Sequence, residues 1–113
     1  MVRSTNAVAL AVSVLALGWS ASAAAQMDAK KAQEVMNKAG CIACHQIDRK
    51  GVGPAYKDVA KKHKGDANAP AALFAKARNG GAGVWGPIPM PPNPPAKISD
   101  GELKQLIGWI LAL

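Results

Sequence analysis

Prolines crowd one short segment of this chain and limit what the segment can become. Six of the eight prolines in the 113 residues lie at positions 87, 89, 91, 92, 94 and 95. Proline fixes φ and lacks a backbone N–H, so neither a regular helix nor a central strand can pass through such a run. The sequence therefore predicts a stiff extended loop here.

The N-terminal residues are typical of an export signal. Arg3 supplies a positive start, residues 7–17 form an apolar run broken only by Ser13, and small residues follow it. This pattern predicts cleavage after Ala25. The run is short for a transmembrane helix, which argues against a membrane anchor. An uncleaved anchor is the alternative to a cleaved signal peptide. We therefore expect residues 1–25 to be a signal peptide, residues 26–113 to form one domain, and the protein to be periplasmic in a bacterium without stable membrane insertion.

The expected domain is poor in large apolar side chains. It has one Phe, one Tyr and, outside the leader, the two tryptophans Trp85 and Trp109. A domain this small usually needs a disulfide, a metal or another staple. A disulfide between Cys41 and Cys44 would close only a tiny loop and would constrain little of the unfolded chain. The sequence thus predicts that some other group fills the core.

Four segments carry helix signals. The first runs from the cap Asp28 to Gly40, the second ends at Gly65, the third follows the cap Asn68, and the last begins at the capping box Ser99–Glu102. We find no repeat and no convincing strand, so the predicted class is all-α, with about four short helices joined by irregular loops. The residues expected to face inward are Ala32, Val35, Met36, Ala39, Leu73, Phe74, Ala77, Leu103, Leu106, Ile107 and Ile110.

The stretch GCIACHQ, positions 40–46, holds both cysteines and admits three chemistries. A redox dithiol of the thioredoxin-like kind belongs to a βα unit, for which this chain shows no strand. A zinc site needs four ligands, and only His45 and His63 could join the two thiolates. His45 directly follows Cys44 and is awkwardly placed to bind the same ion, while His63 is expected on the solvated surface.

Covalent haem attachment is the third chemistry and the one that the spacing favours. In Cys-x-x-Cys-His, Cys41 and Cys44 can form thioethers with the vinyl groups of adjacent pyrrole rings. His45 is then held beneath the ring, where its imidazole can reach the iron. Export agrees with this interpretation, since bacteria attach haem after translocation.

Three segments together resemble a known family: GCIACHQID (40–48), VGPAYKDVA (52–60) and GVWGPIPMPPN (83–93). They are similar to the short bacterial class I cytochromes c of the cytochrome c-551 type, and the last segment is specific to that group. The resemblance spans roughly the whole chain after the leader. It implies the small cytochrome c fold, with N- and C-terminal helices packed across each other around one covalently bound haem c. It also implies a non-enzymatic, single-electron carrier between redox partners in a respiratory chain.

Met90 is the candidate for the iron ligand opposite His45. Prolines on both sides of Met90 would hold its thioether at the iron with little ordering cost. Met36 lies on the apolar face of the first helix, where packing is the expected role, and Met27 lies at the predicted mature N-terminus. With both axial positions filled, the low-spin iron can only exchange electrons. A ligand-binding haem sensor would require that Met90 does not ligate.

The resemblance also implies residues that support the two ligands. Pro54 matches the residue whose carbonyl accepts the Nδ1 proton of the ligating histidine, His45 here. Trp85 matches the tryptophan whose indole N–H binds a haem propionate. The ordinary alternatives are a turn proline and a core aromatic residue.

Further support is implied around the proline-rich loop. Asn93 resembles the asparagine that supports the methionine ligand, with a turn residue as the alternative. Lys76 and Arg78 fall where the family often has basic side chains near the propionates, although solvent exposure explains Arg78 equally well. Residues 94–97 make the connection after Asn93 slightly longer than is usual in the family, which leaves the course of this loop open.

The charge is strongly basic. Of fourteen Lys and Arg, Arg3 lies in the leader, so thirteen face seven Asp and Glu, a net charge of +6. The chain lacks the basic–aromatic pattern of nucleic-acid binding. We expect a monomer that docks acidic surfaces of redox proteins, such as a nitrite reductase, terminal oxidase or dehydrogenase, through an apolar rim near Val52, Ile88 and Pro89. The alternative is an ordinary solvated face. The lysines concerned are Lys30, Lys31, Lys38, Lys57, Lys61, Lys62 and Lys64.

Overall fold

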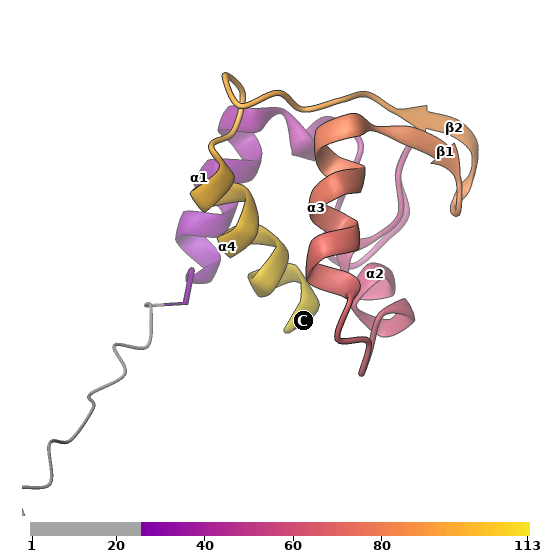
Figure 1. Cartoon of the computed structure of the whole chain (residues 1–113), viewed down its shortest axis with the longest axis horizontal. Helices are drawn as coiled ribbons and strands as arrows, with labels where there is room; N and C mark the ends of the chain where they lie inside the picture. The colour runs from indigo at the N-terminus through magenta and orange to yellow at the C-terminus, as the bar shows by residue number, and fades with distance from the viewer. Residues whose placement is uncertain (1–25) are drawn as a thin grey trace, which may run out of the picture.

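The computed structural model describes residues 26–113 (Figure 1), and the predicted signal peptide lies outside the described residues. Four α-helices and one short antiparallel strand pair make up this part of the chain, which confirms the predicted all-α class. The elements are α1 (Ala29–Ala39), a single 3₁₀ turn (Cys41–Ala43), α2 (Tyr56–Lys62), α3 (Ala69–Asn79), β1 (Gly81–Gly83), β2 (Gly86–Met90) and α4 (Asp100–Leu111).

The predicted ends of α1 and the start of α4 are confirmed. The Asp28 carboxylate accepts a hydrogen bond from the Lys31 N–H at 2.7 Å, and α1 ends at Gly40 with φ of 79°. At α4 the Ser99 hydroxyl accepts from the Glu102 N–H at 3.2 Å. Because Gly40 directly precedes Cys41, the end of α1 fixes where the cysteine motif begins.

The middle helices differ from the sequence prediction in their ends. Asn68 is the N-cap residue of α3 as expected, but its side chain makes no capping hydrogen bond; its N–H donates at 2.9 Å to the carboxylate of Asp66, two residues earlier. The α2 helix ends at Lys62 with His63 as its cap, and Gly65, expected to end it, lies in the following turn with φ of 77°. Asp66 and Asn68 are both short polar residues that can bind nearby backbone groups, and sequence alone does not say which of the two side chains will do so.

The proline-rich segment contains a strand, contrary to the prediction of a plain loop. β2 pairs with β1 in an antiparallel register, Gly81 opposite Met90 and Gly83 opposite Gly86, with an irregularity between them. Prolines are tolerated because they alternate with Gly86, Ile88 and Met90, whose N–H groups stay available, and because the two-stranded sheet has only edge strands. Met90 is the last residue of β2, and Figure 1 shows the β1–β2 hairpin standing out from the helices.

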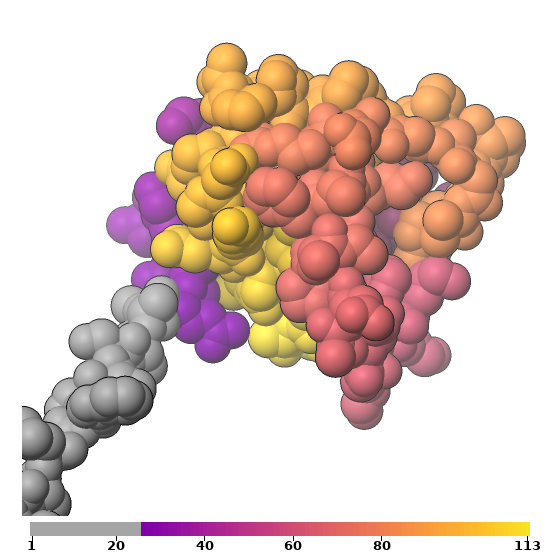
Figure 2. Space-filling model, viewed as in Figure 1, coloured from indigo at the N-terminus to yellow at the C-terminus, as the bar shows by residue number. Residues whose placement is uncertain are grey.

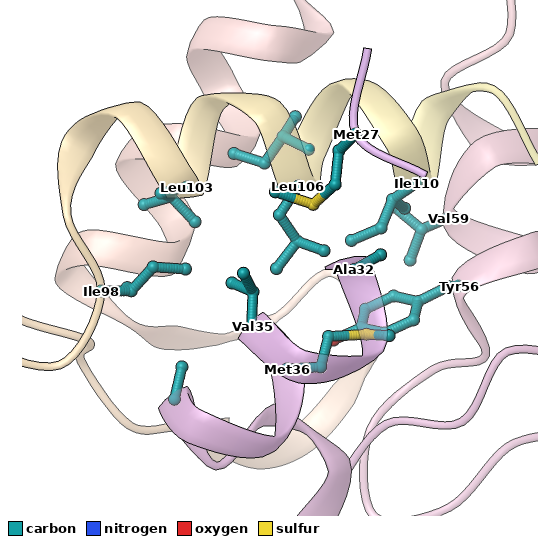
Figure 3. Close-up of a cluster of buried hydrophobic side chains, with 12 residues drawn as sticks. Met27, Ala32, Val35, Met36, Tyr56, Val59, Ile98, Leu103, Leu106 and Ile110 are labelled. Carbon is teal, nitrogen blue, oxygen red and sulfur yellow. The ribbon is translucent and has the colours of Figure 1, made fainter. Parts of the chain in front are cut away.

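One helix organises the core. α4 contacts α1, α2 and α3, and its predicted inner residues Leu103, Leu106, Ile107 and Ile110 are all buried. Figure 3 shows these side chains meeting those of α1 in one cluster. Met27, considered only as an N-terminal residue, is 6 % exposed and belongs to this cluster too.

Candidate haem site

A cavity of about 520 Å³ lies beside the core, bounded by the cysteine motif, the β1–β2 hairpin and α4. Figure 2 shows the molecule hollowed between the hairpin and the α2 region. Cys41, Cys44, His45 and Met90 all line this cavity. Its remaining walls are mainly apolar, and they include Val59, Leu73, Ile98, Leu103, Leu106, Ile107 and Ile110.

The His45 ring is held on three sides. Its Nδ1 lies 2.8 Å from the carbonyl oxygen of Pro54 and must donate there, because a carbonyl oxygen only accepts. The ring stacks on Tyr56 with centroids 4.9 Å apart and planes 13° from parallel. Gly53 closes the third side, since a Cβ on this residue would lie 2.7 Å from His45 Cε1. The tautomer so fixed leaves Nε2 with a free lone pair, as a metal ligand requires.

Backbone hydrogen bonds shape the loop that carries His45. The His45 N–H donates to the Cys41 carbonyl at 3.0 Å, and the Gly53 N–H donates to the Cys44 carbonyl at 2.8 Å. The second bond brings the Gly53–Pro54 segment back against the cysteine motif. The Pro54 carbonyl therefore reaches the imidazole because the loop closes on itself.

Met90 differs from the other methionines in its surroundings. Of the three in residues 26–113, only Met90 lines the cavity, while Met36 is 2 % exposed in the core. The backbone of Met90 packs on Gly80: an added Cβ there would lie 2.9 Å from the Pro91 carbonyl carbon and closer still to the Met90 carbonyl oxygen. The Met90 loop can therefore approach α3 only because residue 80 is glycine.

Asn93 and Arg78 tie the chain after Met90 to α3. The buried Asn93 amide donates to the carbonyls of Ala77 at 3.0 Å and Pro91 at 3.2 Å. Arg78 does not line the cavity, and it is not the solvent-exposed residue that the alternative expected. Its side chain is 12 % exposed and donates to the Asn93 carbonyl at 2.9 Å.

The charged residues at the cavity are all basic. Lys50 and Lys76 line it, whereas no Asp or Glu of the described residues does. Trp85, which is 42 % exposed in the hairpin, also lines the cavity, and Lys62 of α2 lies with its Nζ 5.5 Å from the centre of the indole ring. The cavity thus combines apolar walls with cations that suit a flat apolar group carrying carboxylates.

The surroundings of the cysteines speak against the two alternative chemistries. Burial raises the pKa of the Cys41 thiol, and a hydrogen bond with Tyr56 offsets only part of this effect, whereas reactive dithiols have a lowered pKa. No group of three His, Cys, Asp or Glu in residues 26–113 could hold a metal ion. His63, expected on the surface, is only 18 % exposed and lies 3.9 Å from Asp66, away from the cavity lining. The geometry fits haem: two thiols, an imidazole with a free Nε2 and a thioether face one apolar cavity.

Comparison with known proteins agrees with this chemistry. Residues 29–113 match the sequence model of the family described as cytochrome c. The chain belongs to the cytochrome c family. This cytochrome is 53 % identical to cytochrome c2 of Rubrivivax gelatinosus over 78 residues, covering 69 % of this chain and 92 % of the relative. It is 58 % identical to cytochrome c-551 of Pseudomonas aeruginosa over 73 residues, covering 65 % and 67 %.

Solved structures show the same fold. The crystal structure of wild-type Nitrosomonas europaea cytochrome c552 is 47 % identical, with a TM-score of 0.67, and the alignment covers 72 % of this chain and 98 % of that one. The resemblance to short class I bacterial cytochromes c is therefore confirmed, as is the small cytochrome c fold. The cofactor is one covalently bound haem c, in keeping with Cys41 and Cys44 in Cys-x-x-Cys-His.

Family membership also sets the broad function. This cytochrome c is a monohaem electron-transfer protein whose partners are redox proteins. Within residues 26–113, none of the helices has the length and apolar character needed to cross a bilayer.

Some residues of the site were not predicted from the sequence. Tyr56, Gly53 and Lys50 contact His45 or line the cavity, and Gly80 admits the Met90 backbone. Only the glycines left a usable signal, since Gly53 and Gly80 lie next to predicted site or loop residues. The roles of Tyr56 and Lys50 depend on how the loops close, which no local pattern encodes.

Proposed function

We propose that this cytochrome c is a periplasmic single-electron carrier whose haem is attached to Cys41 and Cys44 and ligated by His45 and Met90. The observation that carries the proposal is that these four side chains line one apolar cavity. The export signal in residues 1–25, with cleavage after Ala25, supports the periplasmic location.

Each residue has a distinct task in this proposal. The haem iron, when bound, supplies a one-electron Fe²⁺/Fe³⁺ couple. Pro54 fixes the imidazole ring of His45 through the 2.8 Å hydrogen bond and raises the basicity of Nε2. The soft thioether of Met90 favours the reduced state and so raises the potential. With His45 and Met90 both bound to the iron, no coordination position would remain open for a substrate.

Further residues would bind the carboxylate edge of the cofactor. Lys76 and Lys50 line the cavity and can neutralise the propionates, and the indole N–H of Trp85 can donate to one of them. Asn93 would support Met90 through the backbone, since its amide donates to the Pro91 carbonyl at 3.2 Å. These contacts would hold the cofactor in one orientation.

The test of this ligand set is a visible spectrum of protein expressed with its own leader in a periplasm. We expect a sharp c-type spectrum on reduction, haem that resists acid–acetone extraction, and in the ferric state the weak long-wavelength band of thioether-ligated iron. Mass spectrometry of the same sample should show a chain that begins at Gln26. A ferric spectrum without the thioether band would contradict Met90 as a ligand, and extractable haem would contradict attachment to the two cysteines.

Partner docking would use the apolar rim of the cavity and the surrounding lysines. Val52 and Ile88 are 54 % and 62 % exposed, and both line the cavity mouth with Pro89. Lys57 is paired with Asp48, but Lys61, Lys62 and Lys64 on the same part of the chain have no carboxylate within 4.0 Å among the described residues. Unpaired cations beside an apolar rim favour partners with acidic surfaces.

Electron transfer to such a partner is expected to slow several-fold as ionic strength rises from low to physiological salt. Salt shortens the screening length to about 8 Å and weakens electrostatic steering. Stopped-flow mixing with an acidic redox protein measures the rate, and a small uncharged oxidant serves as the control, for which the rate should stay constant. A partner rate that is insensitive to salt would argue against basic docking.

A further inference from the structure

Arg78 of α3 contacts the chain after Met90 at three separate residues. Its Nη1 donates to the carbonyl of Asn93 at 2.9 Å and to the carbonyl of Ile98 at 2.7 Å. Its Nη2 forms an ion pair with Asp100 in the first turn of α4. One guanidinium on α3 therefore binds the residues on both sides of the connection 94–97 and the start of the next helix.

The segment from Pro91 to Lys97 is rich in proline and therefore has few backbone donors of its own. Pro91, Pro92, Pro94 and Pro95 have no N–H and contribute carbonyl acceptors only. The connection makes one turn of its own, closed by the Lys97 N–H on the Pro94 carbonyl at 2.8 Å. The connection itself is exposed, but Asn93 and Ile98 on either side of it are buried, so their carbonyls need donors, and the fork of an arginine can donate to both at once.

The position of Asn93 is coupled to that of Met90. Only Pro91 and Pro92 separate the two residues, and proline pairs are stiff. The Asn93 N–H and amide both donate to the Ala77 carbonyl at 3.0 Å, and Arg78 binds the Asn93 carbonyl from the next position of α3. Several hydrogen bonds to α3 hold Asn93, so the stiff segment cannot pivot freely there, and these contacts together with the pairing of Met90 opposite Gly81 determine where Met90 lies.

We propose that Arg78 is a positioning residue that keeps Met90 on the iron. The proposal rests on the proposed ligation by Met90. If Met90 leaves the iron, the stiff segment has to move away from the cavity, and the contacts of Arg78 with Asn93 and Ile98 are broken. By linkage, contacts present only in the closed state favour that state over the open one. An external ligand that competes with Met90 must therefore also break the hold of Arg78.

Imidazole binding to the ferric holoprotein tests the proposal. Loss of the charged donors in Arg78→Gln should tighten apparent imidazole binding by about tenfold, the effect of losing hydrogen bonds to a charged group. Arg78→Lys retains the charge but can reach fewer acceptors, so we expect an intermediate effect. In both variants the thioether band should weaken on warming at lower temperatures than in the wild type.

Asp100→Asn is the matched control. It removes the ion pair but leaves both carbonyl contacts, and Asp100 is 67 % exposed, so imidazole affinity should stay within about twofold of the wild type. Equal affinities in wild type, Arg78→Lys and Arg78→Gln would overturn the proposal, even if the variants unfold more easily. If Arg78→Gln does not fold, Arg78→Lys decides alone. Failure of Met90 ligation itself would show separately, as a wild-type ferric spectrum without the thioether band.

Discussion

The double variant Cys41→Ala/Cys44→Ala should accumulate no folded holoprotein in the periplasm. Without thioethers the haem is not retained covalently, and the cavity of about 520 Å³ loses the group that fills it. Without the haem, the apolar walls of this open cavity would contact water at roughly 25 cal/mol per Å² of apolar surface, a cost to be set against the roughly 5–15 kcal/mol that holds a domain folded. Haem staining after denaturing electrophoresis and far-UV circular dichroism measure the two losses.

Ile42→Ala is the matched control for this variant. Ile42 lies between the two cysteines and is 48 % exposed, so its truncation leaves attachment and core packing intact. The control should stain for haem and show the helical signal of the wild type. A haem-stained, helical double variant would contradict both the attachment sites and the dependence of folding on the cofactor.

Met90→Ala should convert the site from a closed electron-transfer centre into one that binds exogenous ligands. The substitution removes the only methionine of residues 26–113 that lines the cavity. We expect the thioether band to disappear, the ferric iron to bind imidazole or cyanide at concentrations that leave the wild type unchanged, and the reduction potential to fall. Optical titration and spectroelectrochemistry measure these changes.

Met36→Leu separates this effect from the loss of any methionine. Met36 is 2 % exposed on α1 and does not line the cavity, and a Met-to-Leu exchange in a core usually costs less than about 1.5 kcal/mol. Its spectrum and potential should match the wild type. An unchanged ligand field in Met90→Ala, or a lost thioether band in Met36→Leu, would move the sulfur ligand away from Met90.

Local sequence signals predicted the capping residues of α1 and α4 well, and the ends of the middle helices less well. Asp28, Gly40 and Ser99 cap helices within one turn, so the information lies in neighbouring residues. At α3 the Asn68 side chain makes no capping hydrogen bond, and its N–H donates instead to the Asp66 carboxylate two residues earlier. The β1–β2 pair was missed because its partner glycines carry no side-chain pattern, while the prolines argued against any strand.

In the candidate site, too, some residues could be predicted from the sequence and others could not. Cys41, Cys44, His45 and Met90 could be named because their residue types and spacing express the chemistry, and the structure brings them to one cavity. The residues that hold them were harder to identify, since Tyr56 reaches His45 through loop closure and Arg78 binds a carbonyl twenty positions away. Every residue type has the same backbone carbonyl, so a side chain that binds carbonyls produces no recognisable sequence motif.

The core and the cavity share one helix, and this determines which parts of the sequence can diverge independently. Leu103, Leu106, Ile107 and Ile110 belong both to the core cluster and to the cavity wall, whereas no residue of α1 lines the cavity. A substitution on the inner face of α4 therefore alters folding stability and the surroundings of the iron together. Substitutions on the inner face of α1 also alter folding stability, but they change no residue that lines the cavity and reach the iron only through α4 and the cysteine turn.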